Sequence, residues 1–208
     1  MPSLVGSEMC IRDSRYIASP PHTPRGCLLQ GVYMDNDFTY YKYFWEKRFP
    51  SPRTVTFADG VLVNEYCPDC RFCCGPQKEE KPFPMALLDS QISDQTPDNF
   101  YLLDKHTAAL DRRGCKALTP SGCRLERKLR PVACNIFPIV LVNSRLYLYK
   151  ICPASLFLPG ELFQKIAGKV GSMLNGLSAR DVQRISITRD PSDLASKYED
   201  LGISVCGK

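Results

Sequence analysis

Residues 64–75, NEYCPDCRFCCG, place four cysteines within eight residues. Cys67, Cys70 and Cys73 are separated by two residues each, and Cys74 follows directly. Two thiolates at this spacing reach one metal ion, because the turn between them directs both Cβ atoms inward. Adjacent side chains diverge in an extended chain, so Cys74 is expected to serve a second site, a bridge or the core. The stretch therefore predicts a metal-binding turn.

The composition is that of an ordinary globular protein. A chain of 208 residues with 44% hydrophobic and 24% charged residues predicts one domain, with or without appendages. No apolar run approaches the roughly 20 residues that cross a bilayer, and the N-terminus lacks the pattern of a secretory signal. We therefore expect a cytoplasmic protein without membrane contact. In that reducing compartment, 11 cysteines indicate metal ligands rather than disulfides.

The first residues are expected to lie outside the fold. The stretch SLVGSEMCIRDS resembles a translated sequencing adapter, which would make residues 1–14 an artefact. We expect a leader at 1–33 and a native start at Met34. The remaining chain is predicted to form a cysteine-cluster metal-binding domain at 34–158, with a C-terminal helical extension packed on it at 159–208.

Two β-hairpins are predicted from alternating apolar residues. Residues 55–63 form two short runs around an Asp-Gly pair, which is a strong signal for a two-residue turn. Residues 139–149 are rich in strand-forming side chains on both sides of an Asn-Ser turn. Extending the register of this second hairpin sets Asn135 opposite Cys152. Cys134 and Cys152 should then be neighbours at its open end.

The other segments are more mixed. Residues 35–49 are aromatic-rich and fit either a helix or a strand, and residues 85–92 fit one or two helical turns. Residues 159–174 have the spacing of an amphipathic helix. Pro191 and Gly202 bracket another short helix. Together these segments predict an α+β fold: a small cysteine-rich domain with short β-hairpins and a C-terminal helical portion.

Four further cysteines are predicted metal ligands. Cys115 and Cys123 flank a Thr-Pro-Ser-Gly turn that can fold both thiols onto one ion, and the hairpin register adds Cys134 and Cys152. Cys152 precedes a proline, as does the distant ligand of ferredoxin-type C-x2-C-x2-C loops. Eight thiols could fill two four-coordinate sites, or one cluster plus accessory thiols. The predicted ligands are Cys67, Cys70, Cys73, Cys74, Cys115, Cys123, Cys134 and Cys152.

These elements occur in the order found in a known family. CPDCRFCC, then GCKALTPSGCRLERKLRPVACNIFP, then ICP resembles the YkgJ-type CxxCxxCC cysteine-cluster family, whose members are described as zinc- or iron-chelating. The resemblance covers about residues 65–153. It implies metal binding through these cysteines, and it implies no particular reaction.

Two functions stay open at this point. An iron–sulfur cluster, preferably [4Fe-4S], would suit electron transfer or redox sensing with a redox partner protein. Zinc would instead stabilise an interaction module, with the basic segment 112–130 as its contact surface. Nucleic acid is not the expected partner, because these cations would offset the negative charge of thiolate sites. An enzyme of the methyl-transfer or oxidoreductase kind would need a small-molecule pocket that the sequence does not show.

Overall fold

The computed structural model describes residues 35–76 and 83–208. The predicted leader, residues 1–33 with Cys10 and Cys27, lies outside the described residues. The helices are α1 (Asp35–Arg48), α2 (Cys67–Cys70), η1 (Asp89–Gln91), α3 (Thr96–Asn99), η2 (Arg127–Leu129), α4 (Val132–Ile136), α5 (Pro153–Phe157), α6 (Gly160–Asn175), α7 (Ala179–Ile185) and α8 (Pro191–Lys197).

All the sheets in the described residues are small and antiparallel, and the fold is α+β, as predicted. The strands are β1 (Val55–Ala58), β2 (Val61–Asn64), β3 (Phe83–Ala86), β4 (Tyr101–Asp104), β5 (Thr107–Leu110), β6 (Leu118–Thr119), β7 (Gly122–Cys123), β8 (Ile139–Val142), β9 (Arg145–Tyr149) and β10 (Tyr198–Ser204). They pair as β1-β2, β10-β9-β8, β3-β5-β4 and β6-β7. No helix among the described residues is long and apolar enough to cross a membrane.

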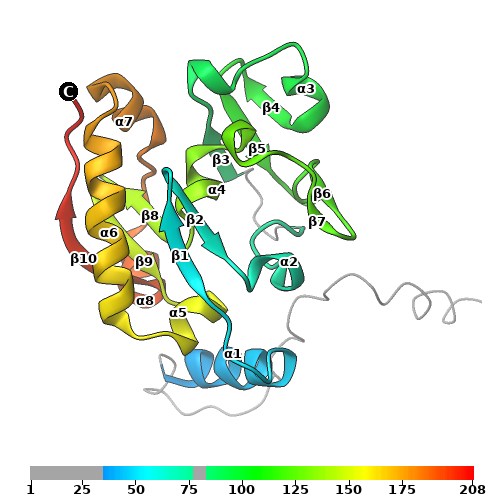
Figure 1. Cartoon of the computed structure of the whole chain (residues 1–208), viewed down its shortest axis with the longest axis vertical. Helices are drawn as coiled ribbons and strands as arrows, with labels where there is room; N and C mark the ends of the chain where they lie inside the picture. The colour runs from blue at the N-terminus through cyan, green and yellow to red at the C-terminus, as the bar shows by residue number, and fades with distance from the viewer. Residues whose placement is uncertain (1–34, 77–82) are drawn as a thin grey trace, which may run out of the picture.

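The described residues form two hydrophobic cores, and the larger lies between α6 and the β10-β9-β8 sheet, which run side by side in Figure 1. The helix predicted at 159–174 is confirmed as α6. Its apolar stripe buries Phe163, Ile166, Val170 and Leu174 against the sheet. This first core also receives side chains from α1, the β1-β2 hairpin and α5, so it supports much of the molecule.

The end predicted for the last helix is wrong. The helix begins at Pro191 as expected but stops at Lys197, and the chain continues as the edge strand β10. Gly202 adopts a φ of 71° where the pairing with β9 shifts register between Asp200 and Ile203. The glycine therefore marks a β-bulge rather than the end of a helix.

Both predicted hairpins are confirmed. The turn between β1 and β2 places Asp59 and Gly60 at φ values of 52° and 74°, and the turn between β8 and β9 places Asn143 and Ser144 at 47° and 62°. Left-handed conformations at both turn residues match the right-handed twist of the paired strands. The first hairpin also packs by its tip against α6, where a Cβ on Gly60 would lie 3.0 Å from Sδ of Met173.

The second hairpin has the predicted register within its strands, but the extension of that register is wrong. The N–H of Tyr149 still donates to the carbonyl of Pro138 at 2.9 Å. Before Pro138 the chain forms the helical turn α4 instead of a strand, so Asn135 does not pair with Cys152. Cys134 lies in this helical turn and therefore outside the β8-β9 ladder.

A second, smaller core lies under the β3-β5-β4 sheet, at the upper right of Figure 1. The helical turns predicted at 85–92 are mostly wrong, because β3 pairs with β5 and only η1 is helical. Pro84 is tolerated there because β3 is an edge strand. The buried residues of this second core are Met85, Leu87, Phe100, Ala108, Leu110, Ala117 and Leu125.

The aromatic segment at 35–49 forms helix α1. The side chain of Trp45 is fully buried, and its indole N–H donates to the carbonyl of Ile151 at 3.2 Å. Its ring contacts Phe72 edge-on, with 6.0 Å between centroids. Phe72 lies between Cys70 and Cys73, and Ile151 precedes Cys152. Helix α1 therefore contacts two cysteine-bearing segments that are far apart in the sequence.

Candidate metal centre

The CxxCxxCC segment is held by two consecutive turns. The N–H of Cys70 donates to the carbonyl of Tyr66 at 2.8 Å, which closes the single turn of α2. Arg71 then adopts a left-handed conformation with φ of 53°, and the N–H of Gly75 donates to its carbonyl at 2.8 Å. The chain reverses direction at Arg71 instead of continuing as a helix.

These turns direct several thiols into one cavity. Its volume is about 30 Å³, which is room for a water molecule or two. Much of the wall away from the thiols is aromatic, supplied by Tyr66, Phe72, Phe137 and Tyr149. The cysteines that line the cavity are Cys67, Cys70, Cys73, Cys74 and Cys152. We call Cys67, Cys70, Cys73 and Cys152 the first thiol set.

Cys152 accepts hydrogen bonds from several donors. It lies directly before α5, and Nδ2 of the buried Asn64 donates to its Sγ at 3.8 Å. Burial raises the pKa of Cys152 to about 11, although hydrogen bonds from the backbone of Ala154 and Ser155 and from Asn64 act to lower it. Donors aimed at a buried sulfur favour a charged thiolate at that position.

Asn64 is a site residue that the sequence analysis missed. Its Oδ1 accepts the N–H of Tyr66 at 3.0 Å while its amide group reaches Cys152, so the side chain links the two cysteine-bearing segments. The available signal was a single amide at the end of an apolar strand, just before the cysteine cluster. Tyr149 was also missed; burial raises its pKa above the ordinary range.

The first set is desolvated around its sulfur atoms. Burial raises the pKa of Cys67 to about 12, with smaller contributions from Cys152 and Cys74, and burial also raises the pKa of Cys70. Cys67 is nevertheless exposed as a residue, so part of it contacts solvent while its sulfur atom is largely desolvated. In the metal-free protein these thiols hold their protons, and metal binding would release them.

Three of the four remaining predicted ligands lie against the second core and not in the first cavity. Cys115 and Cys123 pack against the second core, and Sγ of Cys134 lies 3.9 Å from Sδ of Met85 in that core. The N–H of Cys115 donates to the carbonyl of Cys74 at 2.8 Å. We call Cys74, Cys115, Cys123 and Cys134 the second thiol set.

Electrostatic interactions connect the members of the second set, and Cys74 also interacts with Cys67 and Cys70 of the first. Burial raises the pKa of Cys134, and Cys74, Cys115 and Cys123 raise it further. Burial likewise raises the pKa of Cys115 to about 11, again with contributions from Cys74 and Cys123. Cys134 and Cys152, predicted to be neighbours, therefore belong to different sets.

Cys73 and Cys74 connect the two sets. The thiol of Cys73 donates a hydrogen bond to Cys74, which raises the pKa of Cys73 and lowers that of Cys74. The guanidinium of Arg130 lowers the pKa of Cys74 further. Of these two neighbours, Cys74 ionises first.

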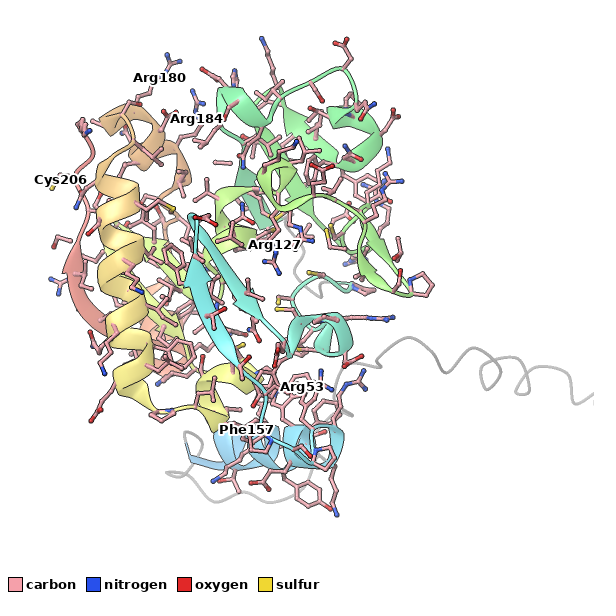
Figure 2. The ribbon with its side chains drawn as sticks, in the orientation of Figure 1. Arg53, Arg127, Phe157, Arg180, Arg184 and Cys206 are labelled. Atoms are coloured by element: carbon pink, nitrogen blue, oxygen red, sulfur yellow. The ribbon has the colours of Figure 1, made fainter. Side chains whose placement is uncertain are left out.

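Two arginines bring positive charge to the thiols. Figure 2 shows Arg127 pointing toward a group of sulfur atoms beside α2, and its Nη1 donates to the carbonyl of Leu62 at 3.1 Å. Burial lowers the pKa of Arg127, whereas Cys67 and Cys123 raise it. Arg130 donates two hydrogen bonds to the carbonyl of Leu125, at 3.0 and 2.9 Å. Both cations would offset thiolate charge.

The other cations of the basic segment mostly bind within the chain. Arg113 pairs with Asp111, Lys116 donates to a backbone carbonyl at 2.6 Å, and Arg124 donates to another at 2.7 Å. The charge of Arg113 is therefore paired, whereas Lys116 and Arg124 keep their charge and are tied to the fold by hydrogen bonds to neutral carbonyls. His106 lies near Asp89, with 3.2 Å between Nδ1 and Oδ1, and is not among the residues of either thiol set.

The donor chemistry fits a thiophilic metal. All nine cysteines that the structure describes are free thiols, and soft sulfur ligands select zinc, copper(I) or iron–sulfur clusters. N–H donors and nearby cations supply the outer contacts that such sites need. As they stand, no three His, Cys, Asp or Glu side chains among the described residues have the arrangement that holds an ion. Ligation would therefore require the thiols to rearrange.

Comparison with known proteins returned no match to a family model, a curated protein or a solved structure. The resemblance to the YkgJ-type cluster family thus stays a prediction that rests on the spacing of its cysteines and on the Arg-Pro and Cys-Pro elements.

Proposed function

We propose that this protein binds a metal cofactor at the first thiol set, preferably an iron–sulfur cluster, and exchanges electrons with a redox partner protein. One observation carries the proposal: the thiols of the C-x2-C-x2-C turn and of the distant Cys152 line a single cavity. Cys152 is far from the other three cysteines in the sequence, so it is the fold that brings the four thiols together. The nearby N–H donors and cations are those expected around thiolate ligands.

The surroundings of the set favour a cluster over a plain zinc site. Much of the cavity wall is aromatic, and Asn64 and the start of α5 direct N–H groups at Cys152. Solvent exclusion and hydrogen bonds to sulfur are the means by which proteins set cluster potentials. A structural zinc site has no potential to set, because zinc does not change its oxidation state.

Each residue has a defined role in this proposal. Cys67, Cys70, Cys73 and Cys152 would hold the cluster, which when bound accepts and returns single electrons. Asn64 orients Cys152 and donates to its sulfur. The aromatic side chains exclude water, and Arg127 offsets negative charge.

The test is anaerobic purification of the full chain, followed by iron, zinc and acid-labile sulfide analysis and a visible spectrum before and after dithionite. We expect about four iron and four sulfide per chain. Cys70→Ser should lose both. Cys206→Ser is the matched control, because Cys206 is exposed and lies at the edge of the molecule opposite α2 (Figure 2).

Zinc without sulfide in the wild-type protein would overturn the iron–sulfur proposal. The cysteines would then stabilise an interaction module. Equal metal loss in Cys70→Ser and Cys206→Ser would show that the thiols do not act through the first set.

A further inference from the structure

We propose that the second thiol set, Cys74, Cys115, Cys123 and Cys134, is a separate binding site for one thiophilic divalent ion such as zinc. This inference deepens the proposed function, since it rests on the first set being a metal site of its own. Residues Cys73 and Cys74, adjacent in the chain, would thereby serve two different centres.

The position of the second set supports a separate site. Cys115, Cys123 and Cys134 are not among the residues that line the cavity of the first set. They lie instead against the second core, through the packing of Cys115 and Cys123 and the contact between Cys134 and Met85. Two different cores thus support the two groups of sulfur atoms.

The backbone brings the members of the second set together from distant parts of the sequence. The N–H of Leu118 donates to the carbonyl of Cys115 at 3.0 Å, and Leu118 pairs with Cys123 in the β6-β7 hairpin. The bond from Cys115 to Cys74 joins this loop to the CxxCxxCC segment. Cys134 enters from α4, which packs beside β3.

Cys74 is fixed at the boundary between the two sets. A Cβ on Gly114 would lie 3.0 Å from the carbonyl oxygen of Cys74 and 2.8 Å from the backbone of Gly75, so only glycine fits there. Gly114 also has a φ of 77°. This close approach holds Cys74 against the loop that carries Cys115, although Cys74 lines the first cavity together with Cys73.

The chemistry of the second set matches a tetrahedral thiolate site. Four thiols suffice for zinc in a closed site, and Arg130 lies near enough to Cys74 and Cys134 to offset part of the charge. Cys134 is exposed as a residue, although its sulfur is desolvated and lies against Met85. Some movement of the side chains is needed, as at the first set.

The experiment measures zinc, iron and sulfide in the full-length wild type and in Cys123→Ser, Cys70→Ser and Cys206→Ser, all purified anaerobically from zinc-supplemented medium. Cobalt(II) added to zinc-depleted protein then probes the second set through the visible bands of tetrahedral cobalt thiolates. Wild type should hold one zinc besides its iron. Cys123→Ser should lose that zinc and the cobalt bands but keep iron and sulfide, and Cys70→Ser should do the reverse.

Cys115→Ser is a second variant of the same set, used if circular dichroism shows that Cys123→Ser does not fold. Simultaneous loss of zinc and iron in a folded second-set variant would overturn the inference, as would wild type with no zinc. Zinc that disappears in Cys123→Ser from a protein without iron would support the second site and refute the iron–sulfur proposal instead. The zinc content therefore tests the second site, and the iron and sulfide content separately tests the iron–sulfur proposal.

Discussion

The two thiol sets are built in different ways. Three members of the first come from one short stretch with two consecutive turns, and the fourth follows a hairpin that packs into the larger core. The second set is assembled from three chain segments, namely the CxxCxxCC segment, the loop of the β6-β7 hairpin and α4, around a core of seven buried residues. A small core contributes little stability by itself, so the region around the second set should depend more on bound metal than the region around the first.

Metal removal should expose this difference most strongly. A structural thiolate site can contribute about 10 kcal/mol or more, comparable to the net stability of a whole domain. After chelation, we expect β3, β4 and β5 to lose amide protection well before α6 and β9. Hydrogen exchange followed by mass spectrometry measures both regions in one sample. Equal loss of protection in both would show that the two cores form one cooperative unit.

Truncation of one buried aromatic ring in each core gives the next largest effect. Phe163→Ala and Phe100→Ala should each cost about 3–5 kcal/mol. The first should lower the stability of the whole protein, whereas the second should loosen mainly the second set and release its metal. Chemical denaturation and metal analysis of both variants check this. Tyr43→Ala, at a residue 60% exposed, is the control and should change stability by less than about 0.5 kcal/mol.

A substitution beside one thiol should affect one set only. Asn64→Asp keeps the oxygen that accepts the N–H of Tyr66 but replaces the donor to Cys152 with a carboxylate. We expect metal affinity at the first set to fall about 10- to 100-fold, with no change at the second. Metal competition titrations of the variant measure this. Asn175→Asp is the matched control, because Asn175 bonds to the backbone at Cys206, away from both sets.

The smallest expected effect comes from a helix cap that belongs to neither thiol set, and it tests whether lower protein stability alone causes metal loss. Ser178 caps α7 by accepting the N–H of Asp181 at 3.1 Å, so Ser178→Ala should cost about 1 kcal/mol. Thermal unfolding should show this loss while metal content stays at the wild-type value. Metal loss in this variant would mean that general destabilisation alone empties the sites, which would weaken every comparison made with cysteine variants.

Local patterns predicted much of the fold. Both hairpins and α6 follow from turn chemistry and apolar spacing within a few residues. The errors arise where distant pairing decides the conformation. A glycine at position 202 is typical of a helix end, but the pairing of β10 with β9 places it in a β-bulge instead. Similarly, α4 forms where a simple extension of the hairpin register predicts a strand.

The candidate site likewise has a part that the sequence predicts and a part that depends on the fold. The turn from Cys67 to Cys73 is visible in the spacing of the residues, because sequence neighbours are spatial neighbours there. The roles of Asn64 and Tyr149 are not visible, since both depend on chain segments that fold back from far away. The assignment of Cys134 required the fold for the same reason.

The contact between Gly75 and Gly114 has a consequence for how the chain could change over evolutionary time. It closes a loop, so the chain leaves the CxxCxxCC segment and returns to the same point before reaching Cys115. Segments whose two ends meet tolerate insertions and deletions well. Descendant sequences could therefore lengthen or shorten the exposed loops of this excursion, while its buried residues, such as Met85 and Phe100, still support the second set. An inserted residue between Cys73 and Cys74, by contrast, would separate the two sets at once.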